Sequence, residues 1–190
     1  KLKDSLNHFK DLKTDVIWRP FQLNPHMPIE GMNREEYLIN KFGSKEKALS
    51  IYKKIYEEGK LANIYFQFKK IKVTPNSFLS HKLLAFAYSK EKQNEVLESL
   101  FYQYFIEGEN IGNLQTLIQI AKQTKVYEKD IENYLLSPQD NENLKNEAKQ
   151  ASAIGITGVP CFIFNKEFVV NGAQSKENFI NLINSIIKNV

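Results

Sequence analysis

The chain has 190 residues, of which 42% are hydrophobic and 25% are charged, so it is long and apolar enough to bury a sizeable core. Its net charge of +4 comes from 26 basic and 22 acidic residues spread along the chain, which argues against nucleic acid as a partner. No apolar run approaches the ~20 residues of a membrane-spanning helix, and the opening Lys1-Leu2-Lys3-Asp4 has no apolar segment of the signal-peptide type, so no membrane partner is expected. The single cysteine, Cys161, excludes an internal disulfide and favours a cytoplasmic location.

The first 32 residues predict a helix, a strand and a loop. Residues 1–12 carry one apolar stripe at helical spacing, formed by Leu2, Leu6, Phe9 and Leu12. Residues 14–21 are rich in strand formers and predict a strand, with Pro20 at its end or on a sheet edge. The loop of residues 22–32 has the composition of a segment that lies over a site. His26 in this loop is the histidine best placed for chemistry, although a surface position is the favoured interpretation.

A block of helices is predicted from Asn33 to residue 154. Asn33 and Ser44 are expected to cap the first two helices, and Gly59 is expected just past the end of the second. A strand-like piece at residues 63–66 interrupts the block. The later helices are expected to begin at Thr74-Pro75-Asn76-Ser77 and to cover about 93–105, 113–124, 128–136 and 139–154.

The end of the chain predicts a hairpin and a final helix. Residues 161–164 and 167–171 read as strands around an Asn165-Lys166 turn, and Ser175 is expected to cap the helix. The proline before the first strand, Pro160, either merely begins the strand or forms a cis peptide bond with Val159. The whole order, with a helical block between two small α/β parts, predicts an α/β protein with an all-α insertion.

Three segments resemble the FrnE-type branch of the DsbA-like thiol–disulfide oxidoreductases. They are WRPFQLNPHMP (18–28), TPNSFLSHKL (74–83) and GITGVPCFIFNKEFVVNGAQ (155–174), and YFIEGENIGN (104–113) agrees with them. The resemblance implies a thioredoxin fold with a large all-α insertion between its two halves. It divides the chain into a first thioredoxin-like part at 1–30, a helical insertion at 31–145 and a second thioredoxin-like part at 146–190. The family is related to kappa-class glutathione transferases and 2-hydroxychromene-2-carboxylate isomerases.

The resemblance also implies that the redox cysteines lie outside these 190 residues. In the family a Cys-x-x-Cys motif opens the first helix, just after the first strand, and Lys1-Leu2-Lys3 matches positions a few places beyond the second cysteine. The first strand and the motif are therefore absent from this chain and are expected upstream of Lys1, and no catalytic residue is expected within it. The absent strand would lie between the strands expected at 15–21 and 161–164. Without it, these two strands would be separated by about 9–10 Å, which leaves backbone groups on both of them unpaired.

By the same resemblance this chain supplies the substrate-binding side of the site. The expected residues are Thr157, Gly158, Val159 and Pro160 in the turn, Ala173 and Gln174 before the last helix, and Asn76 at the start of an inserted helix. Asn76 is at least equally well explained as a helix cap, and Ala173-Gln174 as a helix lead-in. Cys161 is expected in the core, where free cysteines are common. No metal site is expected.

The implied partners are protein or small-molecule thiols and disulfides, with glutathione as a candidate co-substrate and no other cofactor, for a monomer or a homodimer. Two alternatives stay open. One is a glutathione-dependent isomerase or transferase of the kappa-like type, in which a serine replaces the nucleophilic cysteine. The other is a non-catalytic thioredoxin-like binding domain. The residues just upstream of Lys1 would discriminate among the three.

Overall fold

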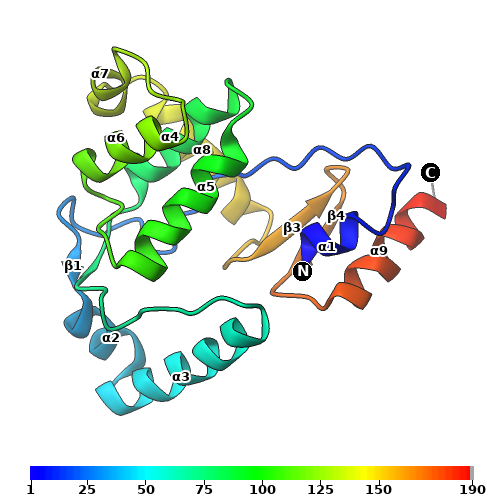
Figure 1. Cartoon of the computed structure of the whole chain (residues 1–190), viewed down its shortest axis with the longest axis horizontal. Helices are drawn as coiled ribbons and strands as arrows, with labels where there is room; N and C mark the ends of the chain where they lie inside the picture. The colour runs from blue at the N-terminus through cyan, green and yellow to red at the C-terminus, as the bar shows by residue number, and fades with distance from the viewer. Residues whose placement is uncertain (189–190) are drawn as a thin grey trace. The chain divides into compact units, whose positions relative to one another are not determined.

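The computed structural model describes residues 1–188 and contains two compact units (Figure 1). The helical unit comprises Trp18–Ala148, and the smaller unit combines Lys1–Ile17 with the chain from Lys149 onward. The boundaries between the units thus fall between residues 17 and 18 and between residues 148 and 149. The division expected from sequence puts them between residues 30 and 31 and between residues 145 and 146. Among the described helices, none has the length and apolar character needed to cross a membrane.

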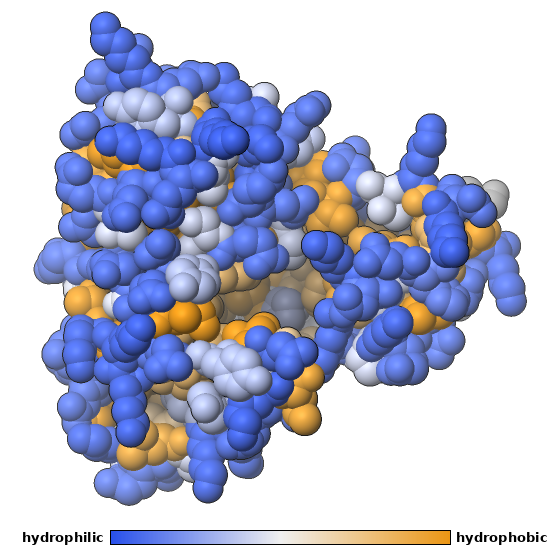
Figure 2. Space-filling view, in the orientation of Figure 1, coloured by the Kyte–Doolittle hydropathy of each residue, from blue (hydrophilic) through white to orange (hydrophobic). Residues whose placement is uncertain are grey.

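The helical unit contains short paired strands and a series of helices. In chain order its elements are β1 (Met32–Asn33), α2 (Arg34–Phe42), α3 (Lys45–Leu61), β2 (Val73–Thr74), α4 (Phe78–Tyr88), α5 (Gln93–Tyr102), the π-helical turn η1 (Gln103–Glu107), α6 (Leu114–Gln123), α7 (Ile131–Leu136) and the first part of α8 (Asn141–Ala153). Figure 2 shows hydrophilic side chains over most of the visible surface of this unit, with apolar residues in smaller patches.

The core of the helical unit lies among α4, α5, α6 and α7. Its fully buried side chains include Leu83, Val96, Leu117, Ile120 and Ile131. Each of these helices buries one side, because apolar side chains that recur every three or four residues share a face. Burial of each such side chain contributes roughly 1.5–3 kcal/mol to stability.

Two helix starts follow the predicted capping chemistry, and a glycine ends the first of these helices. The Asn33 side chain accepts hydrogen bonds from the backbone N–H groups of Glu35 and Glu36, and the Ser44 hydroxyl accepts one from Lys47. Gly43 ends α2 in the left-handed conformation at φ 84°, which costs glycine little. The predicted caps at Asn33 and Ser44 are confirmed.

The predicted strand at 14–21 is wrong, because residues 13–22 form no regular structure. The Gln93 side chain takes the place of a neighbouring strand: its Oε1 accepts from the Trp18 N–H at 2.9 Å, and its Nε2 donates to the Trp18 carbonyl at 3.0 Å. Pro20 has no N–H group to offer to a sheet. Strand-forming residues therefore remain extended here without a strand partner.

Other predicted boundaries also need correction. The first helix, α1 (Leu2–Leu6), ends well before residue 12, where residues of lower helix propensity such as Asn7 and His8 follow. Residues 63–66 form no strand. Gly59 lies inside α3 rather than after it, and a Cβ there would meet Phe66 Cε2 at 2.5 Å. This glycine thus permits close packing instead of ending the helix.

The start of the third inserted helix is shifted as well. Val73–Thr74 pairs with Met32–Asn33 as strand β2, and α4 begins only at Phe78. Farther along, the helix expected at 93–105 consists of α5 followed by the π-helical turn η1, which Gly108 ends at φ 79°.

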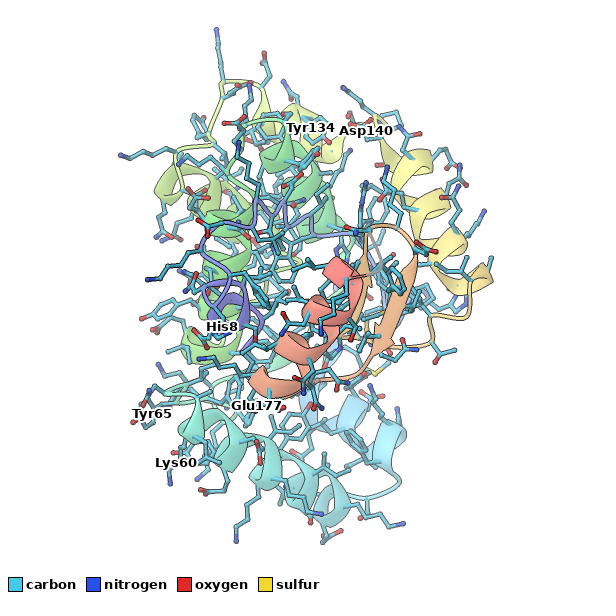
Figure 3. All side chains as sticks on the ribbon, turned by 90° about the vertical axis from the view of Figure 1, so that its right-hand side faces the viewer. His8, Lys60, Tyr65, Tyr134, Asp140 and Glu177 are labelled. Carbon is cyan, nitrogen blue, oxygen red and sulfur yellow. The ribbon has the colours of Figure 1, made fainter. Side chains whose placement is uncertain are left out.

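Two positive charges are buried in the helical unit. Lys82 on α4 is fully buried, and its Nζ donates to the carbonyls of Leu135 and Ser137 near the end of α7 and lies 4.9 Å from the ring centre of Tyr134. The Tyr134 hydroxyl donates to Asp140 Oδ2 at 3.0 Å, and Figure 3 shows these two labelled residues next to each other. Burial lowers the pKa of Lys82, and Asp140 acts against that shift.

Arg34 is the second buried cation, and hydroxyl groups surround it. Its Nη1 donates to Thr74 Oγ1 at 3.1 Å and to the Tyr104 hydroxyl at 3.4 Å, and its Nη2 donates to the Tyr52 hydroxyl. Burial raises the pKa of Tyr104 to about 12, although Arg34 acts to lower it. The guanidinium thereby connects α2 to α3, β2 and η1.

The smaller unit contains a hairpin backed by two helices. Its elements are α1 (Leu2–Leu6), the end of α8 (Asn141–Ala153), β3 (Cys161–Phe164), β4 (Phe168–Asn171) and α9 (Lys176–Lys188). The strands pair antiparallel, with Ile163 opposite Val169. Asn165 and Lys166 both have positive φ, as a tight hairpin turn requires. The predicted hairpin is confirmed.

The two faces of this hairpin differ in what covers them. Phe162 and Phe164 face α9, with ring centres 4.8 and 6.4 Å from that of Phe179. Helix α1 packs on α9, and the buried Ser5 hydroxyl bonds the Lys176 carbonyl at 3.2 Å. Ile163 and Val169 lie on the opposite face and are about half exposed.

Candidate substrate-binding site

The turn between α8 and β3 is hydrogen-bonded to α8 at its start and is exposed to solvent at its end. Gly155 follows α8 with φ 85°, and the buried Ile156 donates its N–H to the Ala151 carbonyl at 3.0 Å. The chain then runs through Thr157 and Gly158 to a cis Val159-Pro160 peptide bond. Of the two alternatives that the sequence leaves open for Pro160, the cis bond is the one that forms.

Val159 presents its backbone to the surroundings. Its side chain is 51% exposed, and Thr157 and Pro160 are exposed as well. Among residues 1–188, the N–H and C=O of Val159 have no hydrogen-bond partner. An extended peptide that approaches Val159 can therefore pair with its backbone donor and acceptor.

The segment before α9 lies beside this turn. The Gly172 N–H donates to the Pro160 carbonyl at 2.8 Å, which brings Ala173 and Gln174 close to the turn. Ala173 is exposed, whereas the Gln174 amide donates to the Asn171 carbonyl at 3.1 Å and accepts from Asn178 at 3.3 Å. The Ser175 hydroxyl caps α9 by accepting from the Asn178 N–H, as predicted.

Six of the seven residues expected to bind substrate therefore gather in one region of the smaller unit: Thr157, Gly158, Val159, Pro160, Ala173 and Gln174. The bond from Gly172 to Pro160 is the contact that joins their two segments. Their proximity is a property of the structure, and their substrate-binding role stays a prediction.

Cys161 begins β3 and is half-buried rather than fully in the core. Burial raises the pKa of its thiol, so the thiolate is disfavoured at neutral pH. A redox-active cysteine needs the opposite shift, because the thiolate is the nucleophile. Cys161 thus lacks the properties of a redox centre.

Asn76 belongs to the helical unit, where its side chain is engaged in protein contacts. Its Oδ1 accepts from the Phe78 N–H at 3.0 Å and from Gln22 Nε2 at 3.3 Å, and its Nδ2 donates to the Met27 carbonyl at 2.7 Å. Asn76 therefore binds the first backbone N–H of α4, just before the N-cap residue Ser77, and fastens the loop at 22–28 to this helix. The predicted substrate contact is untested.

His81, one turn into α4, was not among the residues expected from sequence. Its Nε2 lies 3.3 Å from the Ser77 hydroxyl. Although part of the residue remains exposed, burial lowers the pKa of the imidazole to about 4. His81 is therefore neutral at neutral pH. Its position four residues after Ser77 is the sequence signal for this pair.

Acidification is expected to destabilise the protein through His81. In the unfolded state His81 binds a proton below its pKa of about 6.5, whereas in the folded state it does so only near pH 4. The stability that the neutral imidazole contributes is therefore complete above pH 6.5 and decreases as the pH falls toward 4. Between pH 7 and pH 5 the loss is roughly 2 kcal/mol. Urea unfolding at both pH values measures it.

The matched variants for that measurement are H81Q and H26Q. Glutamine at position 81 keeps a neutral polar group near Ser77 and is expected to reduce the pH dependence, whereas the same change at the exposed His26 is expected to leave it unaltered. Parallel pH profiles for the wild type and H81Q would contradict the assignment.

Two further residues missed from sequence are Tyr37 and Lys41 on α2, which line a hollow with the loop at 23–28. The composition of this loop predicts that it lies over a site, and His26 lines the hollow at an exposed position. The four-residue spacing of Tyr37 and Lys41 was the available signal, because it places both on one face of the predicted helix. Within residues 1–188, no group of three or more His, Cys, Asp or Glu side chains is arranged to hold a metal ion.

A helix, a cis-proline turn, a hairpin and a final helix, with a helical block inserted in the chain before them, define a thioredoxin-like domain of the helical-insertion class. The chain belongs to the DSBA-like thioredoxin domain family, whose sequence profile matches residues 2–184. The predicted fold class is thereby confirmed.

A solved structure agrees with this family membership. The crystal structure of a probable DsbA oxidoreductase from Streptomyces coelicolor superposes with a TM-score of 0.87 at 19% sequence identity, over 97% of this chain and 80% of that chain. At this identity the similarity shows the fold. No curated protein matches the sequence significantly.

Proposed function

We propose that the protein containing this chain is a thiol–disulfide oxidoreductase of the FrnE type. The observation that carries the proposal is the family match over residues 2–184. The proposed redox pair is a Cys-x-x-Cys upstream of Lys1, because Cys161 is a lone thiol whose pKa is raised. This chain supplies the surface that holds the substrate.

In the proposed reaction the first cysteine of the pair acts as a thiolate at the start of a helix, where the helix dipole lowers its pKa. It attacks one sulfur of a substrate disulfide, forms a mixed disulfide and releases the other sulfur as a thiolate. The second cysteine then attacks the mixed disulfide, which releases the reduced substrate and leaves the pair oxidised. Two molecules of a thiol such as glutathione then reduce the pair again and leave as their own disulfide.

The residues around the cis-proline turn hold the substrate while the cysteine pair reacts with it. The unpaired peptide groups of Val159 are suited to hold an extended segment next to the attacking sulfur. Ala173 and Gln174, just before α9, are suited to receive a carboxylate such as that of glutathione, because the N-terminal end of a helix attracts anions.

Insulin reduction by the full-length gene product tests the proposal. The wild type is expected to reduce insulin with a thiol as electron donor, and a double Cys→Ser variant of the upstream pair is expected to have lost turnover. The C161S variant is the matched control and is expected to keep it, because Cys161 is half-buried and lacks a stabilised thiolate. Equal rates for the wild type and the double variant would refute the oxidoreductase function.

A further inference from the structure

A hollow of about 530 Å³ lies in the helical unit. Its size falls in the range of roughly 300–1,000 Å³ that is typical of small-molecule sites. The loop at residues 23–28, strand β1 and helix α2 form its walls. Asn76 fixes this loop through the Met27 carbonyl, so the walls are held in place.

The lining of the hollow combines an apolar wall with a few polar groups. The apolar side chains are Leu23, Pro25, Met27, Pro28 and Met32. The polar ones are Asn24, His26, Tyr37, Asn40 and Lys41. No carboxylate is among the lining residues, and Lys41 is the permanent charge. The hollow is therefore complementary to an apolar molecule that carries a negative group.

The Lys41 ammonium is positioned before any ligand arrives. Its Nζ donates to the Tyr37 hydroxyl at 3.0 Å and lies 5.4 Å from the centre of the Tyr37 ring and 5.9 Å from that of Phe42. Asn24 Nδ2 donates to the same hydroxyl at 3.0 Å, which holds the tyrosine in turn. Less side-chain entropy is lost when a ligand meets a group that is already oriented.

Lys41 also has no carboxylate partner among residues 1–188. Lys45, just after α2, does have a carboxylate partner, because its Nζ forms an ion pair with Glu35 at 2.6 Å. A ligand anion at Lys41 therefore displaces no existing ion pair.

We propose that this hollow binds a small carboxylate with an apolar or aromatic body. The carboxylate accepts hydrogen bonds from Lys41 Nζ. The Tyr37 hydroxyl donates its own proton to Asn24 Oδ1 at 3.3 Å and serves to orient the ammonium. The body of the ligand packs against the prolines and methionines of the wall. The proposal is independent of the redox function.

Titration of the full protein with 1-naphthoate and with its uncharged amide, 1-naphthamide, tests this inference. Shifts of backbone amide NMR signals locate the ligand, and calorimetry gives the affinities. We expect naphthoate to perturb signals of residues 23–41 and to bind roughly fivefold more tightly than the amide. Higher ionic strength is expected to reduce this preference, since salt screens an exposed charge.

The variants K41M and K53M separate the proposed contact from general charge effects. K41M is expected to abolish the preference for the carboxylate, whereas K53M removes a charge from an exposed position outside the lining and is expected to keep it. The inference is overturned if naphthoate does not bind, if its signals map outside residues 23–41, or if K41M retains the preference.

Discussion

Replacing Lys82 with methionine is expected to lower the free energy of unfolding by roughly 3 kcal/mol. The ammonium donates to two carbonyls, those of Leu135 and Ser137, at the end of α7, where the helix dipole also favours a cation. Methionine fills similar space but leaves both acceptors without this donor. The gain from no longer burying a charge offsets only part of this loss, because the Leu135 carbonyl remains buried and the Ser137 carbonyl partly buried.

Denaturant unfolding of K82M beside K54M measures the effect. Lys54 is exposed on α3, so the same substitution there is expected to change stability by less than about 0.5 kcal/mol. Equal stability of the two variants would mean that the Lys82 hydrogen bonds contribute nothing net.

The variant R34L is expected to be destabilised to a similar extent, by roughly 3 kcal/mol. Leucine removes the donor to the hydroxyls of Thr74, Tyr104 and Tyr52 at once, and with it the stacking of the guanidinium 5.0 Å from the Tyr52 ring centre. R34K is expected to recover part of the loss, since it restores a charge but not the planar fork of donors.

Arg19, the other arginine of the chain, offers a matched control for R34L. It pairs with Glu147 at 3.2 Å on the surface, with 67% of its side chain exposed. R19L is therefore expected to cost less than about 1 kcal/mol. Thermal or chemical unfolding of the three variants compares them, and an R34L midpoint equal to that of R19L would contradict the buried role of Arg34.

The sequence was sufficient to predict the features that depend on local chemistry. The caps at Asn33, Ser44 and Ser175 need only one side chain and the next backbone N–H groups. The hairpin turn at Asn165-Lys166 likewise depends on neighbouring residues. The fold class followed from the three family-like segments and their order.

The features that depend on distant partners could not be predicted. Gln93 replaces a strand for Trp18 across 75 positions of sequence, and periodicity contains no trace of this contact. Lys82 and Arg34 are charged residues whose burial contradicts the usual surface position of their type. For Asn76 the motif indicates the residue, but its engagement with Met27 and Gln22 becomes visible only in three dimensions.

The contact between Trp18 and Gln93 makes the single tryptophan of the chain an optical reporter of the helical unit. Its indole N–H donates to Asn94 Oδ1 at 2.6 Å and its ring packs against the helical core, so its fluorescence responds when the start of α5 loosens. The smaller unit contains no tryptophan. A fluorescence transition that coincides with the circular-dichroism transition therefore indicates that both units unfold together, and separate midpoints indicate independent cooperative blocks.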